Sequence, residues 1–289
     1  MQGEWGIVLK RVGVYLSFVR FSHSVFALPF ALAGALLAAR HVPVTPGHVG
    51  WILAAMVGAR SAAMGFNRIA DARLDAANPR TKDRELPRGT MTPREATVFV
   101  IAASLLFIYA AWRLNPLCFV LSPVALAIVF WYSLAKRYTT WTQLFLGLAV
   151  APVGGWLAVG GRGGWDPWLL AAAIGTWVGG FDILYACQDV EFDRAHGLRS
   201  IPVRYGVPAS LVMSRAMHAV TIACLLALPW VTRLPRFYQI GVSVVAVLLY
   251  YEQSLVRADD LSQLKRAFDL NGYVGILYLL VLAASIYVQ

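Results

Sequence analysis

The sequence predicts an all-α integral membrane protein with nine transmembrane helices around a central cavity. The chain has 289 residues, of which 59% are hydrophobic and only 14% are charged, and its mean hydropathy is +0.62. This composition lies outside the range of soluble globular domains. Apolar runs of about 20 residues, the length that spans a bilayer as a helix, recur along the whole chain. We therefore treat residues 1–289 as a single domain embedded in a lipid bilayer.

The predicted spans follow one another in order, with short connections. They cover residues 19–39, 48–68, 95–113, 117–135, 141–160, 166–187, 209–231, 237–256 and 268–288. The first span follows Lys10 and Arg11 as a signal peptide would, but its apolar run is long and eight spans follow, so we expect an uncleaved helix. The longest polar stretch, roughly 69–94, leaves no separate soluble domain.

The charge distribution predicts the orientation of the helices. The net charge is +10, but 18 of the 25 Lys and Arg residues fall on one side of the predicted topology and five on the other. The positive-inside rule then predicts a cytoplasmic N-terminus and an external C-terminus. Because the positive charge follows the membrane topology, we expect no nucleic-acid partner. The three cysteines have no paired spacing, so neither a disulfide framework nor a cysteine metal site is predicted.

A first acidic motif lies at the cytoplasmic end of the second predicted span. Arg60, Asn67, Asp71 and Asp75 fall within an arc of about 80° at 100° per residue, so one helix face carries all four. An ionisable group at this depth is unfavourable unless it has a partner or a function. The alternative is that Asp71 and Asp75 are only the hydrated end of a helix, paired with Arg68 or Arg73.

A second acidic motif ends the sixth predicted span and repeats the same spacing. Asp189 and Asp193 are four residues apart, and on a continuous helix they share one face with Asp182 and Tyr185. Asp182 lies two turns deeper, at a depth comparable to Arg60. It could instead be a buried residue bonded to Arg60 or to a tyrosine. Gln188 and Glu191 lie off this face.

Paired carboxylates on two helices predict a site for Mg2+ and a diphosphate. Mg2+ binds through one or two carboxylates together with waters and ligand phosphates. The predicted metal ligands are Asn67, Asp71, Asp75, Asp189 and Asp193. Basic residues near both motifs could bind the remaining phosphate oxygens, namely Arg80, Lys82, Arg84 and Lys136. The alternative for each basic residue is attraction to anionic lipid.

At these residues the chain resembles the UbiA superfamily of intramembrane prenyltransferases, closest to 4-hydroxybenzoate polyprenyltransferases and their relatives in menaquinone synthesis. The resemblance covers nearly the full length. The matching motifs are Asn67-x-x-x-Asp71-x-x-x-Asp75, the loop from Asn78-Pro79-Arg80 to Gly89, Tyr132-x-x-x-Lys136, Asp182-x-x-Tyr185-x-x-Gln188-Asp189-x-x-x-Asp193, Leu28-Pro29-Phe30-Ala31 and Ser200-Ile201-Pro202.

The resemblance implies Mg2+-dependent transfer of a polyprenyl group from an allylic diphosphate to an aromatic acid. It implies catalytic roles for Asp71, Asp75, Asp189, Asp193 and Lys136, and substrate-binding roles for Arg60, Arg80, Arg84, Tyr132, Asp182 and Tyr185. Arg60 resembles the anchor of the acceptor carboxylate, which favours an aromatic acid over a neutral acceptor. The expected location is the inner, cytoplasmic membrane, with the active site open to the cytoplasm.

Two alternatives remain open at this point. A dihydroxynaphthoic acid of menaquinone synthesis also carries a carboxylate and would be prenylated by the same chemistry. A cation-coupled transporter would also need intramembrane acids, although it predicts acids spread through the bilayer and broken helices. The sequence does not decide the prenyl chain length, the oligomeric state or the group that accepts the ring proton.

Overall fold

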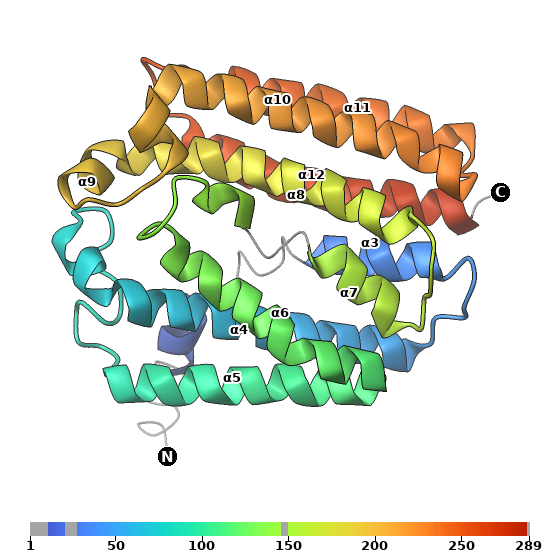
Figure 1. Cartoon of the computed structure of the whole chain (residues 1–289), viewed down its shortest axis with the longest axis horizontal. Helices are drawn as coiled ribbons and strands as arrows, with labels where there is room; N and C mark the ends of the chain where they lie inside the picture. Colours follow the sequence, from blue (N-terminus) through green and yellow to red (C-terminus); the bar gives the residue numbers. More distant parts are fainter. Residues whose placement is uncertain (1–10, 21–27, 146–149, 288–289) are drawn as a thin grey trace, which may run out of the picture.

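The computed structural model describes residues 11–20, 28–145 and 150–287 and is built from helices (Figure 1). No strand occurs among these residues. The elements are α3 (Leu28–Ala38), α4 (Pro46–Ala77), α5 (Pro93–Leu114), α6 (Pro116–Ala135), η1 (Thr142–Phe145), α7 (Val150–Ala158), α8 (Asp166–Ala186), η3 (Cys187–Asp189), α9 (Val190–Ala195), α10 (Ile201–Thr232), α11 (Arg236–Ser254) and α12 (Leu264–Tyr287). The helical class that the sequence predicts is therefore confirmed.

Within the described part of the chain, six helical segments are long and apolar enough to cross a membrane. They are α4, α5, α6, the segment Asp166–Ala195 that comprises α8, η3 and α9, and finally α10 and α12. Helices α3, α7 and α11 occupy the places of the other three predicted spans but do not meet the same criteria of length and composition. Part of the first predicted span, 21–27, and part of the fifth, 146–149, lie outside the described residues. Nine spans and their orientation therefore stay a prediction.

Two helices begin or end at places that the apolar runs do not mark. Helix α4 continues to Ala77, nine residues beyond the predicted end of its span, because the alanine-rich segment after Ile69 keeps helical geometry until Asn78 caps it. The element α10 begins at Ile201 with a short helical segment, in which the Ser200 hydroxyl accepts from the Val203 amide and Pro202 lies in the first turn. Gly206, whose φ of 81° is accessible to glycine, interrupts the helical backbone, so the long part of α10 begins just after it, close to the predicted start at 209.

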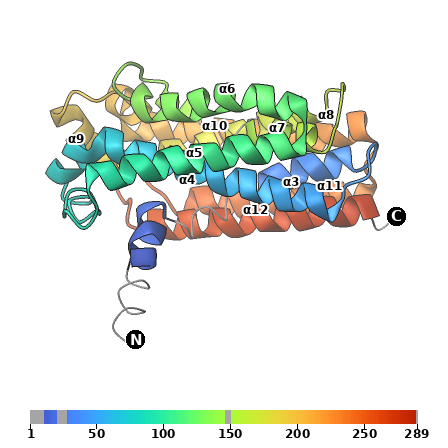
Figure 2. The same ribbon diagram turned by 90° about the horizontal axis from the view of Figure 1, so that it is seen from below.

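The helices form two layers that enclose a central space. Helix α8 packs along α10 and α4 along α5, while α11 packs on α12 (Figures 1 and 2). The largest buried cluster joins α3, α8, α10, α11 and α12, with Trp177 in edge contact with both Phe30 and Tyr278. Helices α3 and α7 approach so closely that a Cβ on Gly155 would overlap the Ala31 carbonyl. Small residues at crossing points allow such close helix packing in membranes.

The outer surface of the bundle is apolar. Large hydrophobic side chains are exposed on α5, α6, α10 and α11, among them Ile101, Val120, Val212 and Ile240. So many exposed large hydrophobic side chains indicate contact with lipid rather than with water. The two loops that follow the acidic motifs, at residues 78–92 and 196–200, lie together at one end of the bundle (Figure 1).

The predicted orientation can be tested by cysteine labelling. In a cysteine-free variant, single cysteines placed within 78–89 and 195–205 should react only with an impermeant reagent applied from the cytoplasmic side. A cysteine at Gly163, an exposed residue at the opposite end of α8, should react from outside. External labelling of either acidic-motif loop would contradict the orientation inferred from the positive charges.

Candidate active site

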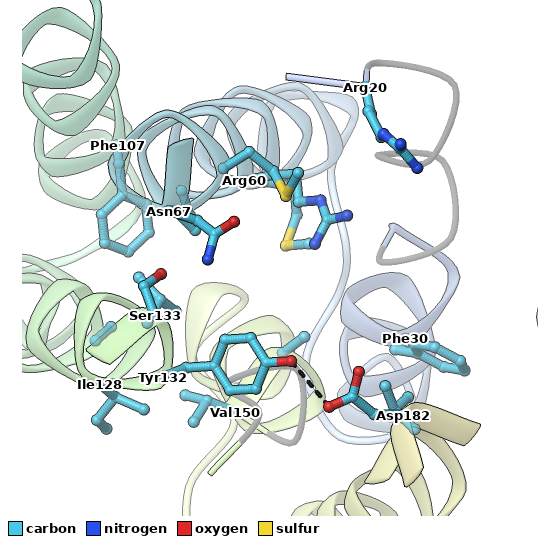
Figure 3. Close-up of a pocket in the computed structure, with 18 of the residues that line it drawn as sticks. Arg20, Phe30, Arg60, Asn67, Phe107, Ile128, Tyr132, Ser133, Val150 and Asp182 are labelled. Atoms are coloured by element: carbon cyan, nitrogen blue, oxygen red, sulfur yellow. Dashed lines mark hydrogen bonds between the residues drawn. The ribbon is translucent and has the colours of Figure 1, made fainter. Parts of the chain in front are cut away.

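A cavity of about 640 Å³ lies between α4, α6, α7 and α8. Twelve residues that the sequence singled out line this one cavity, and Figure 3 shows part of it. They are Arg60, Asn67, Asp71, Asp75, Arg80, Arg84, Tyr132, Lys136, Asp182, Tyr185, Asp189 and Asp193. The carboxylates of both acidic motifs lie toward the end formed by the two loops, a few polar side chains such as Arg60 and Asp182 lie deeper, and most of the remaining lining is apolar. The fold thus brings both acidic motifs together, as their matching spacing predicts.

Two positively charged side chains contact the Asp71 carboxylate between α4 and the end of α6. Its Oδ2 accepts from the Lys136 Nζ at 2.6 Å, and its Oδ1 accepts from the Arg137 Nη2 at 2.8 Å. The Asn67 amide, one turn earlier on α4, donates to the same carboxylate at 3.3 Å. The residue is 3% exposed, so these charged partners compensate its removal from water. The alternative pairing with Arg68 or Arg73 is wrong, because Lys136 and Arg137 are the partners.

Asp75 is held by the loop that follows its own helix. Both of its carboxylate oxygens accept from the Arg84 Nη1, at 2.7 and 2.8 Å. The Thr81 hydroxyl donates to the backbone carbonyl of Asp75 at 3.1 Å, and the Asn78 amide N–H caps α4 by donating to Leu74. These local bonds fold the loop back onto the helix end and place a guanidinium beside the carboxylate.

Asp189 joins the second acidic motif to the first loop. The Arg80 Nη2 and Nε donate to the Asp189 carboxylate at 2.5 and 3.1 Å, and the Asn78 Nδ2 donates at 3.3 Å. Arg80 also donates to the Tyr185 hydroxyl at 3.3 Å and lies 5.6 Å from the centre of its ring. Burial would lower the pKa of Arg80, but the bonds to Asp189 outweigh it and raise the pKa. The two acidic motifs therefore meet through a fully charged arginine.

The helix that carries the second motif is not continuous, contrary to the sequence prediction. α8 ends at Ala186, a 3-10 turn covers Cys187–Asp189, and α9 follows. The tighter turn changes the rotation per residue, so regular helical periodicity does not place Asp189 and Asp193 on one face with Asp182. Both side chains nevertheless line the cavity. Asp193 is half-buried, and among the described residues its carboxylate forms no ion pair.

Tyr132 and Asp182 meet deeper in the cavity. The Tyr132 hydroxyl donates to the Asp182 Oδ2 at 2.8 Å (Figure 3). Of the two partners that the sequence left open for Asp182, the structure pairs it with a tyrosine rather than with Arg60. Arg60 lines the same region, and its buried Nε has no hydrogen-bond partner among the described residues. A guanidinium in such a place is suited to bind an anionic ligand.

Three residues near the site were missed by the sequence reasoning. Arg137 binds Asp71 and the Ala70 carbonyl, but it lies beyond the end of α6, where helical periodicity gives no information. Asn78 both bonds Asp189 and accepts from the Arg80 amide, a role that its Asn-Pro turn sequence could have suggested. Arg20 lines the cavity from a chain segment far from both motifs. Lys82, expected near the phosphate, is exposed and does not line the cavity.

The donor set fits a hard cation that binds together with a phosphate. Among the described residues, no group of three or more His, Cys, Asp or Glu side chains could hold a metal ion by itself. Three of the cavity carboxylates are instead neutralised by Lys or Arg. Carboxylate and amide oxygens with adjacent cations suit Mg2+ bound through ligand phosphates, since this ion takes few protein ligands.

Comparisons with known proteins identify the family. The profile of the UbiA prenyltransferase family matches residues 27–281. The protein belongs to this family. A 4-hydroxybenzoate octaprenyltransferase of Vibrio campbellii is 33% identical over 220 residues, which cover 75% of this chain and 77% of the relative. The protein is therefore an enzyme of prenyl transfer rather than a cation-coupled transporter.

Solved structures show the same fold. The apo structure of a UbiA homolog from Aeropyrum pernix K1 is 35% identical, with a TM-score of 0.82 and coverage of 92% of this chain and 98% of that one. A UbiA homolog from Archaeoglobus fulgidus, solved bound to GPP and Mg2+, has a TM-score of 0.70 at 20% identity and covers 94% of this chain and 99% of that one. The second likeness establishes the fold alone.

Proposed function

We propose that the protein transfers a polyprenyl group from an allylic diphosphate to a ring carbon of an aromatic acid, with 4-hydroxybenzoate as the acceptor. The observation that carries this proposal is the division of one cavity into a charged end and an apolar remainder, with Arg60 between them. The names of the relatives favour 4-hydroxybenzoate and a long prenyl donor in ubiquinone synthesis. The site would open to the cytoplasm from the inner membrane, where the basic loops lie.

The charged end would bind the diphosphate. Asn67, Asp71, Asp75, Asp189 and Asp193 would hold Mg2+, which supplies Lewis-acid stabilisation of the leaving diphosphate when it is bound. Arg80, Arg84 and Lys136 lie beside the carboxylates, so each would be available to bind a phosphate oxygen. Fixed cations in a water-poor site stabilise the charge that develops as the bond breaks.

The uncharged part would guide the reaction that follows. The allylic C–O bond breaks, and the diphosphate leaves with the electron pair. The electron-rich ring carbon then forms the new C–C bond, and loss of the proton from that carbon restores aromaticity. The apolar walls exclude water, which would otherwise capture the allylic cation.

Arg60 supports an acid as the acceptor. Its guanidinium lies two helical turns from Asn67, and Asp182, the carboxylate at similar depth, is already bonded by Tyr132. A substrate carboxylate would complete the hydrogen bonding of Arg60. The same argument admits a dihydroxynaphthoic acid, and the relatives named for 4-hydroxybenzoate favour the smaller acid.

Removing a single carboxylate from either motif tests the metal and diphosphate site. Asp71→Asn or Asp189→Asn should reduce turnover by orders of magnitude, because each removes a charged Mg2+ ligand and a partner of a phosphate-binding cation. EDTA should silence the wild type and added Mg2+ should restore it. Glu191→Gln, which alters an exposed carboxylate of the same segment, is the matched control and should leave turnover unchanged. Full turnover in EDTA would contradict the proposed site.

Replacing Arg60 tests the acceptor. Arg60→Ala removes a charge-assisted bidentate contact of roughly 1.5–3 kcal/mol. The KM for the aromatic acid should rise about tenfold or more, whereas the KM for the prenyl diphosphate should change little. Arg215→Ala, an exposed arginine of α10, is the control for loss of a helix charge. If the wild-type enzyme used 4-hydroxybenzamide as well as 4-hydroxybenzoate, Arg60 would not be the carboxylate anchor.

A further inference from the structure

A second cavity, of about 690 Å³, is formed where the two acidic-motif loops meet the helix ends. Its lining comes from the last part of α4, the loop after α4, the first residue of α5, the turn after α6 and the loop after α9, which lie at one end of the bundle (Figure 1). A volume of this size is in the range of small-ligand sites. Leu74 lines both cavities, so the two share part of α4 as a wall.

The lining of the second cavity combines apolar walls with positive charge. Ile69 and Leu198 are among its apolar residues, and Arg73, Arg137 and His196 are its basic ones. None of the described residues that line it is acidic. The first cavity differs, because aspartates of both motifs accompany its cations. A ligand that carries a negative charge next to an apolar part therefore complements the second cavity.

Aromatic side chains place the second cavity at the level of the membrane surface. Tyr138 follows Arg137 directly, is 61% exposed and stacks on Trp131, with the ring centres 5.8 Å apart. Trp141 and Tyr205, both exposed, form a second such pair with ring centres 6.0 Å apart. Tyr and Trp gather at the depth where lipid headgroups meet the acyl chains. Arg137 therefore lies at headgroup depth, where an anionic phospholipid presents its phosphate.

Arg137 connects the second cavity to the site of the proposed reaction. Its Nη2 donates to the Asp71 Oδ1 at 2.8 Å and to the Ala70 carbonyl at 2.7 Å, and its Nη1 donates to the Ser133 carbonyl at 3.2 Å. The side chain is still 27% exposed, so a ligand in the second cavity can reach the guanidinium. A phosphate bound there would share the charge of Arg137 with Asp71 and would make the surroundings of Asp71 more favourable for a divalent cation.

We propose that the second cavity binds the phosphate of an anionic phospholipid through Arg73, Arg137 and His196, and that the bound lipid promotes binding of the divalent cation at Asp71. The apolar walls receive the first part of the acyl chains. The lipid site does not depend on the proposed function, whereas the effect on the cation rests on it.

Lipid binding is tested by native mass spectrometry of the purified full-length protein, titrated with phosphatidylglycerol or with phosphatidylcholine of the same acyl chains. The wild type should bind phosphatidylglycerol roughly tenfold more tightly, and Arg73→Gln should weaken that binding about fivefold, the effect of one basic residue at a membrane surface. Arg94→Gln is the matched control, because Arg94 is exposed at the same end of the bundle but does not line the cavity. Equal affinity for both lipids, or equal losses in the two variants, would overturn the lipid site.

A soluble competitor distinguishes a lipid headgroup from a free phosphate. Glycerol 3-phosphate carries the phosphate but no acyl chains, so at the concentration of the lipid it should not displace phosphatidylglycerol. Displacement under these conditions would assign the cavity to a soluble phosphate and would contradict the lipid assignment.

The effect on the cation is tested with Mn2+, which prefers the same oxygen ligands as Mg2+. Its affinity is measured by electron paramagnetic resonance in nanodiscs of phosphatidylcholine, with and without phosphatidylglycerol. Phosphatidylglycerol should raise the affinity more in the wild type and in Arg94→Gln than in Arg73→Gln, in which only the general surface potential remains. Equal increases in all three proteins would refute the coupling.

Turnover in the same nanodiscs separates this inference from the proposed function. The purified wild type is given 4-hydroxybenzoate, a prenyl diphosphate and Mg2+ in the presence of phosphatidylglycerol. Absence of product would refute the proposed function and leave the lipid site to the mass spectrometry. Product formation together with unchanged phosphatidylglycerol binding in Arg73→Gln would refute only the inference.

Discussion

The arrangement depends on the neutralisation of three carboxylates that a membrane helix bundle would otherwise exclude. Asp71, Asp75 and Asp189 are nearly buried or half-buried, and each has a Lys or Arg partner within 2.8 Å. Lys136 at the end of α6 pairs with Asp71, and Arg84 in the loop after α4 pairs with Asp75. Arg80 in the same loop pairs with Asp189 of the second motif. Since a buried unpaired charge is strongly unfavourable, these pairs fix how α4, α6 and α8 meet at one end of the bundle.

The same pairs stabilise the site and provide the charged groups that the proposed ligand would need. Cations that neutralise the carboxylates are the groups that a diphosphate needs, and the carboxylates they would release are the groups that Mg2+ needs. In the proposed function, binding the metal and the diphosphate together would exchange one set of charge pairs for another. Much of the remaining lining is apolar and needs no such compensation, and the exceptions are Arg60 and the pair of Tyr132 with Asp182.

The sequence predicted the residues of the site better than the contacts between them. Asn67, Asp71 and Asp75 were grouped correctly because α4 keeps regular geometry through all three. The continuous helix predicted for Asp182, Asp189 and Asp193 is interrupted by the 3-10 turn at Cys187–Asp189, although all three side chains line the cavity. The partner of Asp182 is decided by Tyr132 on a different helix, and Arg137 acts from beyond a helix end. Such pairings depend on tertiary packing, and the spacing of residues along one helix does not predict them. The nine spans and the roles of the individual site residues stay predictions.

The most direct test of this account is the coupling between metal and diphosphate. Mn2+, which prefers the same oxygen ligands as Mg2+, can be titrated into the purified protein and followed by electron paramagnetic resonance, with and without an unreactive prenyl diphosphate analogue. Because Lys136, Arg84 and Arg80 pair with the carboxylates of the site, Mn2+ alone should bind weakly, and the analogue should tighten its binding at least tenfold. Equal affinity with and without the analogue would contradict the exchange of charge pairs on which the account rests.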